Sequence, residues 1–159
     1  TTCHRAENTD NPQRLAQIVE ALVRLSNHFP VVLPIHPRTR RLLAESGMSE
    51  RLGGVRITDP MPFIDMVALE QAAKVILTDS GGVQKEAFFY GVPCVTMRDE
   101  TEWTETIAAR WNVLVGADAD KIVSAVISAR EGSQGVAPYG SGKASADIVR
   151  ALILASGVS

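Results

Sequence analysis

The sequence has few of the features that mark several protein classes. It contains two cysteines among 159 residues, Cys3 and Cys94, which are too few for a disulfide framework and lack metal-ligand spacing. A reducing cytoplasm is therefore the expected compartment. The net charge of −2 gives no general attraction to nucleic acid or to an anionic membrane. No apolar run approaches the ~20 residues that span a bilayer, and no signal-peptide pattern opens the chain.

What is present is the composition of a globular protein. Hydrophobic residues make up 45% of the chain and charged residues 21%, which is typical of a folded domain. The length suits one domain with an ordinary core, and the sequence contains no internal repeat.

Short apolar runs alternate with longer segments in which apolar residues recur at helical spacing. The short runs predict strands over residues 31–35, 55–57, 74–77, 93–97 and 113–115. The longer segments predict helices over residues 11–27, 39–46, 62–73 and 143–154, one of about ten residues after Gly82, and one from Asp118 to about Arg130. Apolar strands between helices predict an α/β fold, a Rossmann-like parallel sheet with helices on both faces.

In such a sheet, ligands bind beyond the carboxyl ends of the strands, so the strand-to-helix loops are the places to look. Four polar loops stand out, at residues 1–10, 35–37, 78–82 and 97–105. All of them follow a strand or open the chain, and we expect them to meet at one edge of the sheet.

The loop at residues 78–82 has two glycines at the mouth of a helix. Gly81 and Gly82 let a ligand approach the backbone, and the helix presents unpaired N–H groups that suit a phosphate, helped by the Ser80 hydroxyl. Glu86, one turn inside, can accept hydrogen bonds from a ribose diol. Taken alone, the motif is better explained by Asp79 and Ser80 capping the helix and the glycines making a tight turn, since it is neither GxGxxG nor a P-loop.

The other loops supply cations and imidazoles. His4, Arg5, His36 and Arg98 are each explained, singly, by a solvated surface position. The guanidinium of an arginine is, however, a planar fork suited to phosphate oxygens. Around a glycine-flanked helix these residues favour an anionic small molecule, and a nucleoside diphosphate would use every one of these features.

Four blocks then carry a family resemblance: "TCHRAEN" from Thr2, "DSGGVQKEA" from Asp79, "GVPCVTMRDETEWTET" from Gly91 and "PYGSGKAS" from Pro138. In this order they resemble the carboxyl-terminal half of the non-hydrolysing UDP-N-acetylglucosamine 2-epimerases. The resemblance implies a glycosyltransferase-B-like fold of two Rossmann-like domains, in which residues 1–159 are the second, nucleotide-sugar-binding domain. It further implies a cytoplasmic homodimer that inverts C2 of a UDP-sugar by UDP elimination and re-addition, without cofactor or metal.

The resemblance also implies roles for individual residues. Ser80, Gly81 and Gly82 would hold the pyrophosphate, Arg98 would pair with phosphate, and Glu86 would take the ribose hydroxyls. His4 would be the catalytic residue that assists departure of UDP.

Further binding residues follow from the same resemblance. Arg5 and Glu7 would shape the loop around His4, and Arg5 and His36 match residues that contact a second, regulatory UDP-GlcNAc in bacterial relatives. Phe63 and Met66 bound the segment expected to meet the uracil.

Three departures from the family pattern have structural consequences. Arg110 stands where the family has glycine, which is unfavourable if the backbone there needs a positive φ. The apolar strand that normally leads into Thr2 is missing, which would expose its two neighbours in the sheet. The amino-terminal domain, with its acid and base carboxylates, is also missing, so we expect no epimerase activity from this chain alone.

Three alternatives stay open from the sequence. The parent protein could be a variant epimerase that acts on a UDP-diacetamido-uronic acid, because the same UDP grip would serve. It could be a glycosyltransferase-B-type transferase, although the "HRAEN" loop at residues 4–8 argues against this. It could also be a non-catalytic nucleotide-sugar-binding module.

Overall fold

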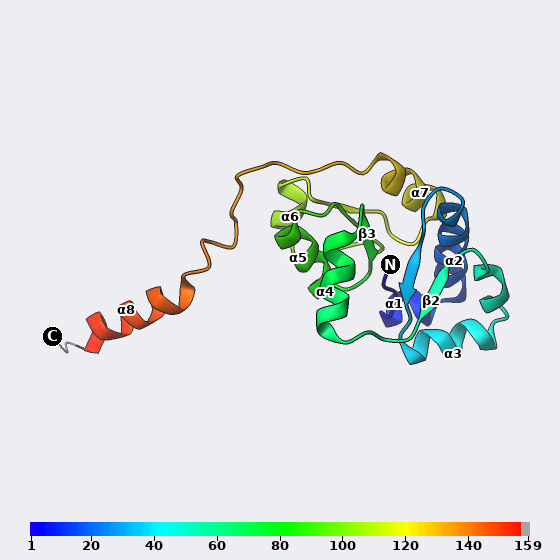
Figure 1. Ribbon diagram of the computed structural model, residues 1–159, viewed down its shortest axis with the longest axis horizontal. Coiled ribbons are helices and arrows are strands. Elements are labelled where there is room, and N and C mark those ends of the chain that lie inside the picture. The colour runs from blue at the N-terminus through cyan, green and yellow to red at the C-terminus, as the bar shows by residue number, and fades with distance from the viewer. Residues whose placement is uncertain (157–159) are drawn as a thin grey trace.

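In the computed structural model, which describes residues 1–156, five short parallel strands alternate with helices (Figure 1). One sheet pairs β1 (Val32–Pro34) with β2 (Arg56–Thr58). A second sheet has the order β3 (Ile76–Thr78), β4 (Cys94–Thr96), β5 (Asn112–Leu114). The five predicted strands and the parallel α/β class are confirmed, although each strand is shifted or trimmed by one or two residues.

The first two residues lie between these sheets. The Thr1 ammonium group donates to the Val32 carbonyl at 2.7 Å. The Thr2 N–H donates to the Leu77 carbonyl at 3.0 Å, and Thr2 forms an isolated parallel bridge with Thr78. Residues 1–2 therefore connect β1 to β3 as the end of an intervening strand would.

An apolar cavity of about 380 Å³ continues this line between β1 and β3. Its lining includes Thr1, Val32 and Leu77, together with Phe29 and Val126. Burial in this region lowers the pKa of the Thr1 amine to about 6. The cavity lies where we expect, from the sequence, the apolar strand that leads into Thr2.

Helices cover both faces of the three-stranded sheet, as predicted. On one face, α2 (Pro12–Ser26) packs against α7 (Ala119–Ser128), and their core includes Cys3, Leu77 and Val95. On the other face, α4 (Phe63–Ala72) packs against α5 (Gly81–Tyr90), and the core there includes Ile76 and Cys94. Successive residues of a strand point to opposite faces, so Ile76 and Leu77 belong to different cores.

The two cysteines are free and buried, one in each of these cores. Burial raises the pKa of both thiols, and the Asp79 carboxylate raises the pKa of Cys3 further. Both side chains therefore stay as neutral thiols and pack as small apolar groups.

Local sequence explains where the helices begin. The Asn11 side chain accepts from the N–H groups of Gln13 and Arg14, and Pro12 occupies the first turn of α2. Asp118 caps α7 in the same way, by accepting from the Lys121 N–H at 3.0 Å. α3 (Pro37–Glu45) starts two residues earlier than predicted, because the His36 ring caps it through the Arg38 N–H.

Three short elements were not predicted from the sequence. They are α1 (Ala6–Thr9), the 3₁₀ turn Ser49–Leu52 and α6 (Thr104–Ala108). Each is too short to show an apolar period. In α4, the apolar residue Ile64 is 72% exposed and faces away from the core.

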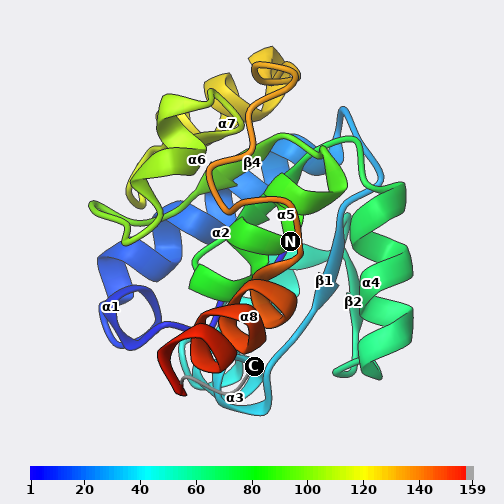
Figure 2. The same cartoon turned by 90° about the vertical axis from the view of Figure 1, so that its left-hand side faces the viewer.

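The last helix, α8 (Ala144–Ser156), stands apart from the body at the end of an extended segment (Figure 1) and projects toward the viewer in Figure 2. None of its residues is buried, and its exposed apolar side chains are Ile148, Val149, Leu152, Ile153 and Leu154. Within residues 1–156, no helix has the combination of length and apolar character needed to cross a membrane.

The segment before α8 contacts the body at Ser133, which forms hydrogen bonds with Ala109 and Trp111, and again at Tyr139. The Tyr139 ring packs against the Phe88 and Phe89 rings, with centroid distances of 5.5 and 5.6 Å. The Lys85 ammonium lies 4.2 Å from the Trp103 ring centroid and 4.6 Å from that of Tyr139. This cluster attaches the Gly- and Ser-rich loop of residues 131–142 to α5.

Arg110 has a positive φ of 61°, and it is the one non-glycine residue in residues 1–156 with that conformation. It follows the end of α6, where the Arg110 N–H donates to the Ile107 carbonyl and the Trp111 N–H to the Thr106 carbonyl. This pair of hydrogen bonds is the Schellman motif, whose left-handed position glycine usually fills. The strain anticipated from the sequence at Arg110 is therefore present.

We expect Arg110→Gly to raise the free energy of unfolding by about 0.5–1 kcal/mol. The left-handed conformation costs a side-chain-bearing residue roughly 1–2 kcal/mol, part of which is offset by the larger backbone entropy of glycine in the unfolded chain. Urea denaturation measures the change. Gly47→Ala is the reverse control. Gly47 has a φ of 68° and a Cβ there would contact no other residue, so the alanine should lower the free energy of unfolding by a similar amount through backbone strain alone. Loss of stability in Arg110→Gly would show that the arginine side chain outweighs its backbone strain.

Candidate functional site

The loops that follow the strands meet at the carboxyl edge of the sheets, together with the first ten residues. A cavity of about 200 Å³ lies there, lined among others by His4, His36, Met66 and Val83. The His4 and His36 ring centroids are 6.3 Å apart. Residues far apart in sequence, including three of the predicted site residues, are therefore neighbours around one cavity.

Asp79 organises this edge from within the protein. Its carboxylate has no exposed surface and accepts hydrogen bonds from the His4 N–H at 3.0 and 3.1 Å and from the Arg5 N–H at 3.0 Å. It also accepts from Asn8 Nδ2 at 3.1 Å, and that amide group donates to the Met97 carbonyl at 2.9 Å. Asp79 therefore does not cap α5, and instead holds the amino-terminal loop against the ends of β3 and β4.

Ser80 is the residue that caps α5, as the sequence allowed. Its hydroxyl accepts from the Val83 N–H at 3.5 Å, a long and weak bond. The helix begins at Gly81, where a Cβ would collide with the Glu102 carboxylate. The first N–H groups of a helix have no partner inside it, so this end of α5 favours a negatively charged group.

Arg98 reaches this helix end from the loop after β4. Its side chain is about nine-tenths buried, and its Nη1 donates to Glu102 Oε2 at 2.7 Å. Its Nε is buried without a hydrogen-bond partner. The Arg5 guanidinium approaches the same carboxylate, with Nη2 3.9 Å from Glu102 Oε1.

Glu102 is thus a residue of the candidate site that the sequence analysis did not identify. Its own backbone N–H, the Arg98 hydrogen bond and the charges of Arg98 and Arg5 lower its pKa. The signal available in the sequence was its position four residues after Arg98. That spacing is informative only if the segment turns, as it does here.

A buried polar network fixes the loop that carries Arg98 and Glu102. Gln84 Oε1, on α5, accepts from Thr101 Oγ1 at 2.7 Å and from Asn112 Nδ2 at 3.0 Å. Asn112 Oδ1 in turn accepts from Thr96 Oγ1 at 2.7 Å. The network joins β4, β5, α5 and the loop, and it fixes the position of the loop relative to the start of α5.

His4 lies at the rim of the site. Its ring Nδ1 is 3.7 Å from Asp79 Oδ1, and 42% of its side chain is exposed. Its backbone is fixed by Asp79, so the ring projects from a rigid segment toward the cavity. His36 is exposed as well, and its Nδ1 is used to cap α3 by accepting from the Arg38 N–H at 3.2 Å.

Two of the predicted binding residues lie away from the helix end. Glu7 pairs with Arg14 at 3.1 Å, and Arg14 also contacts Asp99 at 2.9 Å, so Glu7 braces the outside of the loop. Phe63 begins α4 with 69% of its surface exposed.

The partly exposed Glu86 on α5 faces a second carboxylate that sequence reasoning did not identify. Glu70, on α4, is 3% exposed, and both of its carboxylate oxygens are buried without a hydrogen-bond partner. Burial raises the pKa of Glu70 to about 7; the Glu86 charge adds to the increase, and the Thr1 amine opposes it. Within residues 1–156, no three His, Cys, Asp or Glu side chains gather in an arrangement that could hold a metal ion.

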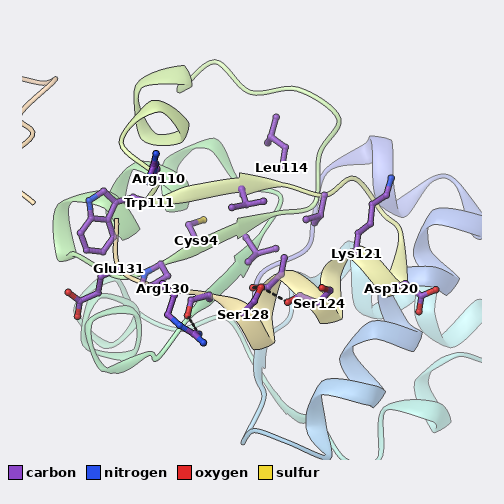
Figure 3. Close-up of a pocket in the computed structure, with 16 residues that line it drawn as sticks. Cys94, Arg110, Trp111, Leu114, Asp120, Lys121, Ser124, Ser128, Arg130 and Glu131 are labelled. Carbon is purple, nitrogen blue, oxygen red and sulfur yellow. Dashed lines mark hydrogen bonds between the residues drawn. The ribbon is translucent and has the colours of Figure 1, made fainter. Parts of the chain in front are cut away.

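A larger cavity, about 780 Å³, lies elsewhere, between β5 and α7 (Figure 3). Its charged side chains stand at the ends, with Asp120 and Lys121 at one and Arg110, Arg130 and Glu131 at the other. None of the predicted site residues lines it. We place the candidate site at the carboxyl edge of the sheets, because the cations, the helix end and the imidazoles converge there.

Known proteins resemble this chain along nearly its whole length. The family described as UDP-N-acetylglucosamine 2-epimerase matches residues 1–153. A UDP-2,3-diacetamido-2,3-dideoxy-D-glucuronate 2-epimerase of Pseudomonas aeruginosa is 57% identical over 126 residues, 77% of this chain and 34% of the relative. A UDP-N-acetylglucosamine 2-epimerase of Methanocaldococcus jannaschii is 40% identical over 157 residues, 95% of this chain and 43% of the relative.

The solved structures agree with these relatives. The crystal structure of the Methanocaldococcus jannaschii UDP-GlcNAc 2-epimerase in complex with UDP-GlcNAc and UDP superposes with a TM-score of 0.80 at 37% identity. The match covers 96% of this chain and 44% of that structure. The chain therefore spans less than half the length of the relatives that it matches.

We expect Asp79→Asn to lower the free energy of unfolding by about 2–3 kcal/mol. An amide group would place N–H donors against the N–H groups of His4, Arg5 and Asn8, so buried donors would lose their acceptor. Urea denaturation measures the loss. Asp99→Asn is the matched control, because Asp99 forms only an exposed ion pair with Arg14 and should cost less than about 1 kcal/mol. Equal losses in the two variants would contradict the role of Asp79.

We expect Glu70→Gln to stabilise the protein at pH 8 by up to about 3 kcal/mol more than at pH 5. With a folded pKa of about 7 against 4.5 for a free side chain, folded Glu70 keeps a proton that the unfolded chain has released. Its contribution is therefore full below pH 4.5 and is lost as the pH rises through 7. Urea titrations at both pH values test this, with the exposed Glu50→Gln as control. A difference independent of pH would contradict the shift.

Proposed function

The chain belongs to the UDP-N-acetylglucosamine 2-epimerase family, and from this we propose that it is the UDP-binding domain of a sugar-nucleotide 2-epimerase. One observation carries the proposal. The glycine-flanked end of α5, the buried Arg98 and the His4 loop held by Asp79 converge on one anion-binding edge. The solved relative named as a complex with UDP-GlcNAc and UDP supports the same ligand class.

In this proposal the diphosphate lies over the first turn of α5. The N–H groups of Gly81 and Gly82 and the Ser80 hydroxyl donate to its oxygens, and Arg98 neutralises its charge. Glu86 accepts from the ribose hydroxyls, and the uracil lies near Met66 at the cavity and the exposed Phe63. Arg5, Glu7 and His36 frame the same edge.

His4 is the catalytic residue that we assign on this chain. In the elimination, a base removes the proton from C2, the C1–C2 double bond forms, and the C1–O bond breaks with its electron pair on UDP. In the return step, the UDP oxygen bonds to C1 again and C2 receives a proton on the opposite face. His4, at the rim beside the helix end, donates to or stabilises the charge that develops on the departing diphosphate.

We propose that a second domain supplies the acid and base for C2. The relatives are more than twice as long as the matched region, and the apolar cavity beside Thr1 suits an additional central strand. The parent protein would then be a cytoplasmic homodimer with the substrate between two domains, and residues 1–159 alone would be inactive.

A UDP-diacetamido-uronic acid is the second candidate substrate, favoured by the 57% identity to the Pseudomonas aeruginosa relative of that name. The UDP grip is the same for both substrates, and the sugar contacts would come mainly from the other domain. The parent protein should be offered both nucleotides in parallel, since product from only one of them identifies the sugar.

The direct test is incubation of the parent protein with UDP-GlcNAc in D₂O, followed by proton NMR. Conversion to UDP-ManNAc with deuterium at C2, in the absence of any acceptor, is the expected result. Hydrolysis alone, or transfer only after an acceptor is added, would favour a transferase. UDP binding without conversion of either sugar nucleotide would favour a binding module. Turnover by residues 1–159 alone would contradict the proposal that a second domain supplies the acid and base for C2.

We expect Arg98→Ala to weaken UDP binding by about 1.5–3 kcal/mol, because a buried charge-assisted pair with phosphate is lost. Titration calorimetry measures the change in affinity. Arg24→Ala is a suitable control, since Arg24 forms exposed ion pairs with Glu20 on α2 and with Asp120 on α7. Unchanged affinity in Arg98→Ala would remove this residue from the site.

A further inference from the structure

A carboxylate of the protein itself covers the helix end that would receive phosphate. A Cβ built on Gly81 would meet Glu102 Oε1 first, followed by the Glu102 carboxyl carbon and Trp103 Nε1, both at 3.4 Å. The Glu102 side chain therefore lies directly over the first residue of α5. An oxyanion of a ligand could not occupy the same space.

The groups around Glu102 are those that bind an oxyanion. Arg98 Nη1 donates to one carboxylate oxygen at 2.7 Å, and Arg5 Nη2 is 3.9 Å from the other. The positive end of the α5 dipole faces the same carboxylate. Two cations and a helix end thus act on one acidic side chain, as they would act on a phosphate group.

The remaining donors of this site are not satisfied by Glu102. Arg98 Nε and Trp103 Nε1 are both buried without a partner, and the Arg98 side chain is about nine-tenths buried. A carboxylate has two oxygens and one charge, whereas a diphosphate has more oxygens and more charge. A diphosphate can therefore engage donors that Glu102 leaves unpaired.

We propose that Glu102 is an internal competitor for the anion site: its carboxylate takes the place of a phosphate group in the free protein, and a bound diphosphate displaces it. This inference rests on the proposed function, because it concerns the same UDP site. Glu102 is suited to leave, since 46% of its side chain is exposed and it lies on the loop before α6. Arg98 stays in place, and its guanidinium passes from the carboxylate to the phosphate.

Displacement sets the affinity and selectivity of the site. Apparent affinity falls in proportion to the fraction of molecules in which the site is open. A ligand with a single carboxylate would only replace one carboxylate by another, and it gains little. A diphosphate gains the unpaired donors and the second charge, so the competitor favours it over simple acids.

The experiment compares wild type, Glu102→Gln and Glu100→Gln by titration calorimetry with UDP and with inorganic pyrophosphate. Glu100 is an exposed glutamate two residues away, so its substitution removes the same charge from the same loop. We expect Glu102→Gln to bind both ligands about tenfold more tightly, and Glu100→Gln to stay within about twofold of wild type. The backbone amide NMR signal of Gly81 should follow the titration of Glu102 in the free protein and lose this dependence with saturating pyrophosphate.

The outcomes separate this inference from the proposed function. If wild type binds UDP but Glu102→Gln binds UDP and pyrophosphate no more tightly, the competitor role is overturned and the nucleotide site stands. If pyrophosphate binds, more tightly to Glu102→Gln, while UDP does not bind, the competitor role stands and the nucleotide assignment falls. Absence of binding in all three proteins would overturn both.

Discussion

The arrangement of the site depends on the buried carboxylate of Asp79. It accepts from two backbone N–H groups of the amino-terminal loop and from the Asn8 amide, across more than seventy residues of sequence. A fully buried charge is tolerated only with such a set of donors. Because Asp79 directly precedes the α5 cap, the same residue places His4 and Arg5 beside the helix end. Asp79 therefore converts separate loops into one rigid edge.

The charges at this edge are balanced internally, which explains why net charge does not reveal the site. Arg98 is held by Glu102, Arg14 by Glu7 and Asp99, and Arg38 by Asp10. A chain of net charge −2 can thus contain a site for an anion, because acidic partners cancel the cations in the overall sum. The exposed partners cost little to separate, whereas the buried arginine needs an anion at all times.

The fold could be predicted from the sequence because each strand is an apolar run between polar loops, and Asn11, Ser80 and Asp118 mark helix starts by local chemistry. Arg110 stands where the resembling family has glycine, and its positive φ is the condition under which the sequence predicted an unfavourable residue there. The roles of Asp79, Glu102 and Glu70 were not predicted. Their partners lie on other elements, and α1 and α6, which shape the loops, are too short to leave a periodic signal. The local sequence pattern predicts the helices and strands. Contacts between residues far apart in the sequence decide which polar side chains take part in the site.

The two neutral, buried thiols lie in different cores, one on each face of the three-stranded sheet. Cys3 belongs to the core beneath α2 and α7, and Cys94 to the core beneath α5, so each sulfur is enclosed by a different side of the sheet. Only a thiolate reacts with alkylating reagents, and neither sulfur ionises readily while it is enclosed. The alkylation rate of each cysteine consequently measures how often the core that encloses it opens. Comparing the alkylation rates of Cys3 and Cys94 therefore shows whether the two sides of the sheet open together or one after the other.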